Sequence, residues 1–243
     1  MSKGIFIIGT DTEVGKTVVS SGLMHLLLSN KYKAAYFKPV ASGEVMLGGA
    51  YQSIDASFIK KVSGFAEDQK KITPFSFKNA VAPHFAARLE SRSIDLTVIK
   101  DILRYLKNRY EFIIAEGAGG LAVPLDDQGF MQYDLIRELG FPCLLVARTG
   151  LGTINHTLLT LRFAQSTGLV IKGIVMNGNR QTRAETDNIE TIRKLSGIPA
   201  IFTIPALNGV DTEKLQPGNI ADVFESTIDI DEIIGLMEEI PRV

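Results

Sequence analysis

Short, uninterrupted apolar runs alternate with amphipathic stretches along this chain. The runs lack the polar alternation of a half-exposed strand, so they predict strands buried on both faces. They occupy Gly4–Ile8, Ala34–Phe37, Phe112–Ala115, Cys143–Ala147, Ile171–Met176 and Ala200–Ile204. Between several of them, apolar residues recur every three or four positions, which predicts helices. The clearest sets are Val19, Leu23, Leu26 and Leu27, then Ile99, Ile102, Leu103 and Leu106, and then Ile154, Leu158 and Leu161.

The alternation of strands and helices predicts an α/β fold. We expect a mostly parallel sheet with helices on both faces, because crossover helices connect parallel strands. Ligands of such sheets bind beyond the carboxyl ends of the strands, so the residues that follow each run are the first candidates for function. The segment Gly43–Ser53 carries Gly48 and Gly49 in its middle, and we expect it to be a loop near that edge.

The first strand leads into a glycine-rich turn of the phosphate-binding type. The segment Gly9–Thr17 reads GTDTEVGKT and is followed by a helical pattern. In this layout, backbone N–H groups and the helix dipole converge on an anion. We expect Lys16 to reach the outer phosphates of a nucleotide and the Thr17 hydroxyl to bind Mg²⁺. The spacing is atypical, since five residues separate Gly9 from Gly15 where four are usual.

The composition fits one ordinary globular domain spanning residues 1–243, with 45% hydrophobic residues available for a core. The 26 basic and 27 acidic residues give a net charge of -1, so no overall field attracts nucleic acid or an anionic membrane.

The lone cysteine, Cys143, excludes an internal disulfide and is read as a small buried hydrophobe. Because the chain has no apolar leader and no run of membrane-spanning length, we expect a cytoplasmic protein.

A lysine follows the second apolar run. Lys38 stands at the same expected edge as the glycine-rich turn, where its ammonium would bring a second positive charge to a phosphoryl group. The alternative is a solvated lysine at a strand end. Ser42, four residues further on, offers a hydroxyl to a substrate.

Two carboxylates complete this set of strand-end candidates. Glu116 closes the third run, which is the position of the Walker-B acid in nucleotide-binding proteins. Asp55 begins a helical segment and is either a second acid of the site or only a helix cap. Mg²⁺ prefers hard oxygen ligands, and Thr17, Asp55 and Glu116 would supply them together with phosphate oxygens.

Two later segments also carry candidate binding groups. Gly150–His156 begins a helix, and its free N–H groups would suit a carboxylate or a phosphate, although most helix starts bind only water. Asn177 follows the fifth run and offers amide groups to a nucleobase. It lacks the Asn-Lys-x-Asp context that reads guanine, so ATP is the preferred nucleotide.

Together these motifs resemble the dethiobiotin synthetase family. The five-residue spacing in the glycine-rich turn is that family's own form. The match runs from about residue 4 to residue 210, whereas Glu44–Ser53 and the tail after Leu207 depart from the family pattern. The segments that carry the resemblance are Gly9–Thr17, Lys38–Gly43, Asp55, Pro83-His84, Glu116–Gly120, Gly150–His156, Asn177 and Ile204-Pro205.

The resemblance implies an ATP- and Mg²⁺-dependent enzyme that converts 7,8-diaminononanoate and CO2 (or bicarbonate) to dethiobiotin, ADP and phosphate. One amine captures CO2 as a carbamate, and the carbamate attacks the γ-phosphate to give a carbamic-phosphoric anhydride. The second amine then closes the cyclic urea and expels phosphate. The resemblance also implies a homodimer with active sites at the subunit interface.

Residue roles follow from the same resemblance. Lys38 and Lys16 are expected to be catalytic, and Thr17, Asp55 and Glu116 are expected to hold Mg²⁺. The residues expected to bind ATP are Glu13, Val14, Gly15, Lys16, Thr17, Val18, Asp55, Glu116, Gly117, Ala118, Gly119, Met176, Asn177, Pro205, Ala206 and Leu207. The residues expected to bind the diamine are Thr12, Ser42, Gly152, Thr153, Ile154 and Asn155, of which the last four reach the neighbouring subunit's site.

Two other classes of protein share parts of this pattern. A dimeric switch ATPase of the partitioning type would carry an extra lysine early in the turn, where this chain has Asp11 and Thr12. A membrane-targeting tail of such a protein would be basic, whereas the tail here is acidic. A related amidoligase would bring a glutamine-hydrolysing domain, for which we expect no room in this chain.

Overall fold

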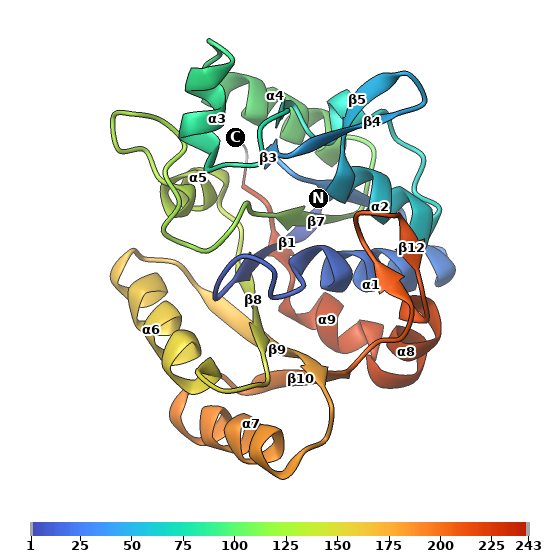
Figure 1. Cartoon of the computed structure of the whole chain (residues 1–243), viewed down its shortest axis with the longest axis vertical. Helices are drawn as coiled ribbons and strands as arrows, with labels where there is room; N and C mark the ends of the chain where they lie inside the picture. Colours follow the sequence, from blue (N-terminus) through green and yellow to red (C-terminus); the bar gives the residue numbers. More distant parts are fainter. Residues whose placement is uncertain (1, 242–243) are drawn as a thin grey trace.

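A parallel sheet forms the centre of the computed structural model, which describes residues 2–241 (Figure 1). All six predicted strands are present, in the order β10-β9-β8-β1-β7-β2. Their bounds are β1 Lys3–Gly9, β2 Ala34–Phe37, β7 Phe112–Glu116, β8 Cys143–Arg148, β9 Ile171–Asn179 and β10 Ala200–Pro205. A short strand, β13 (Glu238–Glu239), pairs antiparallel with the start of β1. The predicted, mostly parallel sheet is therefore confirmed.

Helices cover both faces of this sheet. Figure 1 shows α1, α8 and α9 on one side of the strands, and α5 and α6 on the other. The α-helices are α1 Lys16–Ser29, α2 Ile54–Ser63, α3 Pro83–Leu89, α4 Leu96–Lys107, α5 Gln132–Leu139, α6 Thr153–Ser166, α7 Arg183–Leu195, α8 Ile220–Thr227 and α9 Ile230–Leu236, and a 3-10 turn, η1, spans Gln69–Lys71. The three helices with the clearest predicted periodicity appear as α1, α4 and α6.

Three small sheets flank the main one. Strand β3 (Val40–Ser42) pairs in parallel with β6 (Phe75–Phe77), and β11 (Val210–Asp211) pairs antiparallel with β12 (Gln216–Pro217). The segment expected to be a loop, Gly43–Ser53, is instead mostly a hairpin of β4 (Glu44–Leu47) and β5 (Ala50–Ser53).

The correction at this hairpin has a simple backbone cause. Gly48 and Gly49 both have positive φ, at 59° and 85°, and the strands pair directly on either side of them. Two consecutive positive-φ residues are what the commonest two-residue hairpin turn requires. The Gly-Gly pair was therefore a hairpin signal rather than a sign of an irregular loop.

The tail after Leu207 includes α8, which packs closely against α1. Phe224 of α8 is buried and meets α1 at Gly22, where an added Cβ atom would lie 2.3 Å from the Phe224 ring. The glycine thus allows α8 to pack directly against α1. Cys143 is fully buried in β8, as predicted. Within residues 2–241, no helix has the length and apolar character needed to cross a membrane.

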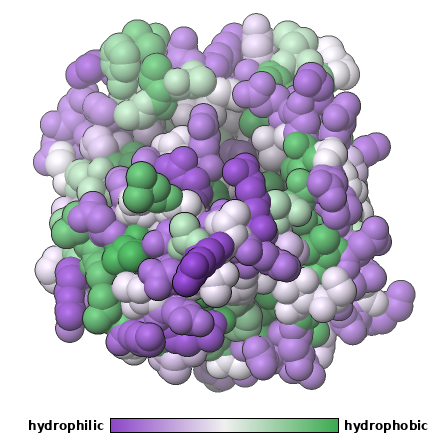
Figure 2. Space-filling model, turned by 60° about the horizontal axis from the view of Figure 1, so that its bottom comes forward, coloured by the Kyte–Doolittle hydropathy of each residue, from purple (hydrophilic) through white to green (hydrophobic). Residues whose placement is uncertain are grey.

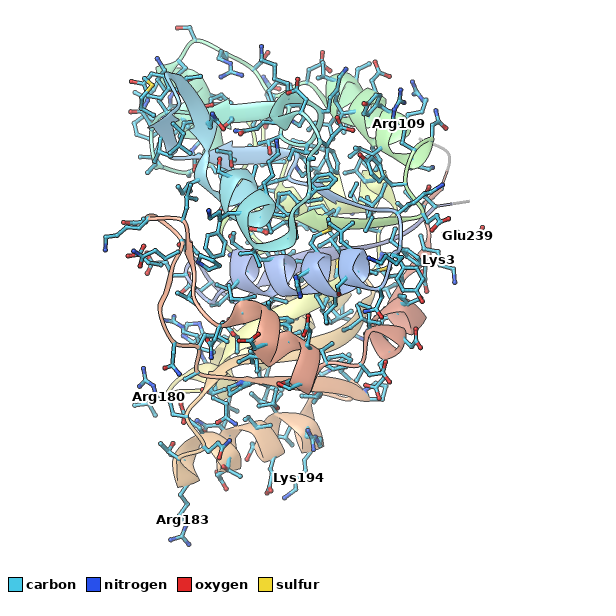
Figure 3. All side chains as sticks on the ribbon, turned by 90° about the vertical axis from the view of Figure 1, so that its right-hand side faces the viewer. Lys3, Arg109, Arg180, Arg183, Lys194 and Glu239 are labelled. Atoms are coloured by element: carbon cyan, nitrogen blue, oxygen red, sulfur yellow. The ribbon has the colours of Figure 1, made fainter. Side chains whose placement is uncertain are left out.

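Parallel pairing gives the sheet two chemically different edges. We call the edge where the parallel strands end the carboxyl edge, and the edge where they begin the amino edge. Figure 3 separates the two, since Lys3 and Arg109 lie at one end and Arg180, which follows β9, lies at the other. Residues that follow β1, β2, β7, β8 and β9 therefore meet at one edge.

Candidate functional site

The glycine-rich turn connects β1 to α1 at the carboxyl edge. Gly15 precedes α1 with φ of 94°, and no side chain caps the start of the helix. An added Cβ at Gly15 would lie 2.1 Å from Asn177 Nδ2, so only glycine fits this position without displacement. Asn177 in turn donates from Nδ2 to the Val14 carbonyl at 3.0 Å, which ties β9 to the turn. The uncapped N–H groups are available to an anion.

Three charged side chains converge beside this turn. Lys38 Nζ donates to Asp55 Oδ2 at 2.5 Å and to Glu116 Oε1 at 2.9 Å. They come from separate elements: Lys38 follows β2, Asp55 lies in the first turn of α2, and Glu116 ends β7. Asp55 is thus more than a helix cap, because Ser53 caps α2. The alternative of a solvated Lys38 is excluded, since 6% of its side chain is exposed.

Thr17 links the two carboxylates. Its hydroxyl lies 2.8 Å from Asp55 Oδ1 and 2.9 Å from Glu116 Oε1. The hydroxyl has one proton and donates to one of these acceptors at a time. The Thr17 hydroxyl and the two carboxylates together form a cluster of oxygen atoms. Lys16 Nζ donates to the Asp11 carbonyl at 3.0 Å and closes over the turn.

Burial and nearby charges shift the pKa values of the two lysines in opposite directions. Burial alone would lower the pKa of Lys38, but the adjacent Asp55 and Glu116 carboxylates raise it above its ordinary value. Burial would raise the pKa of Asp55, yet the Lys38 ammonium beside it holds that pKa below its usual range. Lys16 has no such close partner, and burial lowers its pKa to about 8. Lys38 is therefore a permanent cation, whereas Lys16 gains most from a bound anion.

Two cavities lie on either side of the glycine-rich turn and share Glu13 and Gly15. The first, here called the Lys38 cavity, has a volume of about 570 Å³. It is lined by Thr12, Glu13, Gly15, Lys16, Thr17, Val18, Lys38, Ser42, Asp55, Glu116, Ala118 and Gly119 from the predicted set, and by Val210, Asp211, Thr212 and Glu213 from the tail. The second, here called the Asn177 cavity, has a volume of about 440 Å³. It contains Val14, Gly152, Thr153 and Asn177 from the predicted set.

Some predicted site residues line neither cavity. Met176 is fully buried in β9, so its side chain belongs to the core. Gly117 packs against Gln132 instead of facing the Lys38 cavity. The other predicted residues outside both cavities are Ile154, Asn155, Pro205, Ala206 and Leu207.

Two buried polar residues that hold Glu116 and the turn after it were absent from the prediction, in addition to the tail residues that line the Lys38 cavity. Gln132, which is 2% exposed, accepts from the Ala118 N–H at 2.6 Å and donates to the Gly120 carbonyl at 2.7 Å. It therefore clamps the turn that follows Glu116. Tyr36 is fully buried in β2 and donates its hydroxyl to Glu116 Oε2 at 3.0 Å. A tyrosine inside an otherwise apolar strand was the available signal, because a buried phenol needs a hydrogen-bond partner.

The oxygen cluster suits a magnesium ion shared with phosphate. No group of three or more His, Cys, Asp or Glu side chains within residues 2–241 is arranged to hold a metal by itself. Mg²⁺ is commonly held by one or two carboxylates, water and substrate phosphates rather than by a complete protein cage. Asp55, Glu116 and the Thr17 hydroxyl form a donor set of that kind beside the phosphate-binding turn.

Comparison with known proteins identifies the family. A family model described as an AAA domain matches residues 3–214. The ATP-dependent dethiobiotin synthetase BioD of Clostridium acetobutylicum is 39% identical over 243 residues, covering 98% of this chain and 100% of the relative. This chain belongs to the dethiobiotin synthetase family. BioD of Bacillus subtilis is also 39% identical, over 213 residues, covering 87% of this chain and 90% of the relative. Membership of this synthetase family makes the chain an enzyme of the ligase type.

Solved structures share the fold of this dethiobiotin synthetase family member. The MinD cell division protein of Aquifex aeolicus has a TM-score of 0.62 at 15% identity and covers 99% of each chain. The cell division ATPase MinD of Pyrococcus furiosus has a TM-score of 0.60 at 21% identity, covering 97% of this chain and all of the relative. These similarities confirm the predicted P-loop NTPase-like fold and, at such identities, say nothing of activity.

Proposed function

We propose that this enzyme carboxylates 7,8-diaminononanoate and closes it to dethiobiotin, using CO2 and Mg-ATP and releasing ADP and phosphate. The observation that carries the proposal is the convergence of Lys16, Lys38, Asp55, Glu116 and Thr17 on one cavity beside a phosphate-binding turn. A cavity of about 570 Å³ is in the usual range for small-molecule sites. The family membership supports the same reaction.

ATP is proposed to lie along the glycine-rich turn, with its phosphates at Lys16 and its base toward Asn177. The buried Oδ1 atom of Asn177 has no hydrogen-bond partner within the described residues 2–241. A buried acceptor without a partner favours a ligand that donates to it, as the amino group of adenine does. The role predicted for Met176 would then concern its backbone, because Met176 buries its side chain.

The ion proposed to be held by Thr17, Asp55 and Glu116 would neutralise phosphate charge when bound. The chain's own contribution is to bring Lys38 and Lys16 to the place where two anions must meet. A carbamate and a triphosphate repel each other, and buried cations oriented in advance reduce that repulsion without having to reorganise during the reaction. Ser42 lines the same cavity and is proposed to contact the diamine.

The proposed steps balance without a covalent enzyme intermediate. One amine of the diamine attacks CO2 and loses a proton, which gives the carbamate. A carbamate oxygen attacks the γ-phosphorus, ADP leaves, and a carbamic-phosphoric anhydride forms. The second amine then attacks the carbonyl carbon and loses a proton, and phosphate leaves as the cyclic urea closes. Each step needs orientation and charge stabilisation, which this cavity is suited to supply.

A homodimer is proposed because α6 carries an exposed apolar stripe. Leu159 and Phe163, four residues apart, are 62% and 38% exposed, and the polar Asn155, predicted to reach the neighbouring subunit, lies one turn before them. Figure 2 shows hydrophobic residues exposed among hydrophilic ones on the face that it presents. In sedimentation we expect a two-chain particle that Leu159→Glu dissociates. Leu195→Glu, which changes a similarly exposed leucine on α7, is the matched control.

The function is tested by supplying Mg-ATP and bicarbonate with or without 7,8-diaminononanoate. We expect ADP and cyclic urea to form only with the diamine. Lys38→Met, which keeps the stem of the side chain, should lower kcat by about a hundredfold or more, as loss of a preorganised electrostatic group does. Lys100→Ala, which breaks only a surface ion pair with Glu138, is the control. Equal ATP hydrolysis without the diamine would instead favour the switch ATPase.

A further inference from the structure

Glu116 uses its two carboxylate oxygens for different partners. Oε1 lies 2.9 Å from both Lys38 Nζ and Thr17 Oγ1, on the side of the Lys38 cavity. Oε2 lies 3.0 Å from the Tyr36 hydroxyl, which approaches from within the sheet. Glu116 and Tyr36 are both fully buried. The carboxylate is therefore held at one oxygen by the site and at the other by the core.

The position of Tyr36 in the sheet makes this contact rigid. Tyr36 pairs with Ile114 in the parallel register between β2 and β7, two residues before Glu116. Residues two apart on a strand point to the same face, so the phenol and the carboxylate lie on one side of the sheet. Neighbouring strands are hydrogen-bonded along this stretch, and neither side chain can move far without disturbing the core.

We propose that Tyr36 is a positioning residue that orients Glu116 for binding the magnesium ion. This inference rests on the metal role assigned to Glu116 in the proposed function. A carboxylate is free to rotate about its last bond, which exchanges the two oxygens and changes the lone pairs that face a ligand. The phenol donates to Oε2 and so keeps Oε1 directed at Thr17 and the cavity.

A purely structural role for Tyr36 makes a different prediction. Removing a hydrogen bond from any buried carboxylate lowers stability, whether or not the carboxylate meets a metal. Only a positioning role also weakens metal binding, because hydrogen-bonded partners of a metal ligand set its orientation and basicity. Metal affinity therefore distinguishes the two roles, and stability does not.

The test variant is Tyr36→Phe, which removes one hydroxyl and keeps the ring. The matched control is Tyr110→Phe, because Tyr110 also donates to a glutamate, at 3.0 Å to Glu67 Oε2, on the amino edge. Each full-length chain is titrated with Mg²⁺ in the presence of saturating ADP, and the thermal unfolding midpoint is followed. Ligand-induced stabilisation reports affinity even when a variant has become less stable.

We expect Tyr36→Phe to need about tenfold more Mg²⁺ for half of the maximal stabilisation, and Tyr110→Phe to need the wild-type concentration. Replacing Mg²⁺ by Mn²⁺ gives a direct spectroscopic measure of the same affinity. An unchanged Mg²⁺ requirement in Tyr36→Phe overturns the inference while leaving the proposed function standing. A wild-type chain without any Mg²⁺ effect overturns both the metal site and the inference. Normal metal binding without turnover of the diamine contradicts only the proposed reaction.

Discussion

Two tyrosine–glutamate hydrogen bonds of the same length lie at opposite ends of strand β7, in different surroundings. At the carboxyl edge, Tyr36 donates to Glu116 at 3.0 Å, and both residues are fully buried. Near the amino edge, Tyr110 donates to Glu67 at 3.0 Å, and both are half-buried. Tyr105 shares the Glu67 carboxylate at 3.2 Å.

The difference between the two pairs lies in what else the carboxylate must satisfy. Glu116 contacts Lys38 and Thr17 at a cavity of about 570 Å³, and its carboxylate is fully buried beside this proposed substrate site. Glu67 accepts from two phenols and from the Asp68 N–H, with no lysine or arginine among its described hydrogen-bond partners, and it lies beside an open groove that includes Lys33 and Arg109. Electrostatic interactions are stronger where water is excluded. Under the proposed function, we therefore expect this hydrogen bond to be mainly structural at the amino edge and to position a metal ligand at the carboxyl edge.

The comparison is tested most severely by removing each negative charge without changing side-chain shape. Glu116→Gln deprives Lys38 of a charged partner and the proposed metal of a ligand, so we expect kcat/KM to fall by about a hundredfold or more. Glu67→Gln should leave kcat/KM within about twofold and cost roughly 1 kcal/mol of stability. Diamine-dependent ADP release and thermal unfolding measure the two effects. Similar losses of activity in both variants would refute the distinction between the edges.

A smaller effect is expected from adding one methyl group at a glycine of each edge. Gly15 and Gly64 both have positive φ, at 94° and 75°, and alanine is strained at both positions. Only at Gly15 would the new Cβ also collide with Asn177, 2.1 Å away, whereas Gly64 faces open space. Gly15→Ala should therefore weaken ADP binding by about tenfold or more, and Gly64→Ala should cost about 1 kcal/mol of stability with normal binding.

Calorimetric titration of ADP checks this pair of variants. If Gly15→Ala bound ADP as tightly as wild type, the close packing of Asn177 on the turn would have no role in nucleotide binding. Gly64→Ala carries a similar backbone strain at a position remote from the turn, so it controls for a general loss of stability.

The sheet was predictable because its strands are buried on both faces. The run Ala34–Phe37 coincides with β2, since an apolar run in a buried parallel strand has polar residues at both limits. Strand β9 extends beyond its predicted end at Met176 to Asn179, because pairing with β8 and β10 continues through polar residues. Apolar runs therefore locate the buried part of a strand and underestimate the length over which it pairs with its neighbours.

The candidate site was predictable where topology alone brings residues together. Lys38 follows β2 and Glu116 ends the adjacent parallel strand β7, so the two had to meet at the carboxyl edge. Tyr36 and Gln132 were missed because their hydrogen bonds depend on side-chain packing between segments distant in sequence. The tail residues Val210–Glu213 were missed because short strands with few apolar residues carry no periodic signal.

The smallest expected effect concerns the ionisation of the two phenols in alkali. Burial, followed by the charges of Glu116 and Asp55, raises the pKa of Tyr36 well above its ordinary value. Burial and the hydrogen bond to Glu67 raise the pKa of Tyr110 to about 12. Each folded phenol keeps a proton that the unfolded chain loses near pH 10. The stability that each contributes is therefore complete below about pH 10 and is lost as the pH rises through the folded pKa.

Phenolate absorbance distinguishes the two phenols among the chain's six tyrosines. Tyr110→Phe should remove a step that occurs near pH 12 in the folded chain, because the phenol is half-exposed and loses its proton to solvent. Tyr36→Phe should remove absorbance that appears only together with unfolding, since ionisation would bury a second negative charge beside Glu116. If the Tyr36 absorbance instead rose near pH 10 with the fold intact, the carboxyl edge would be open to water. The contrast between the two edges would then rest on the contacts of Glu116 with Lys38 and Thr17 and not on the exclusion of water.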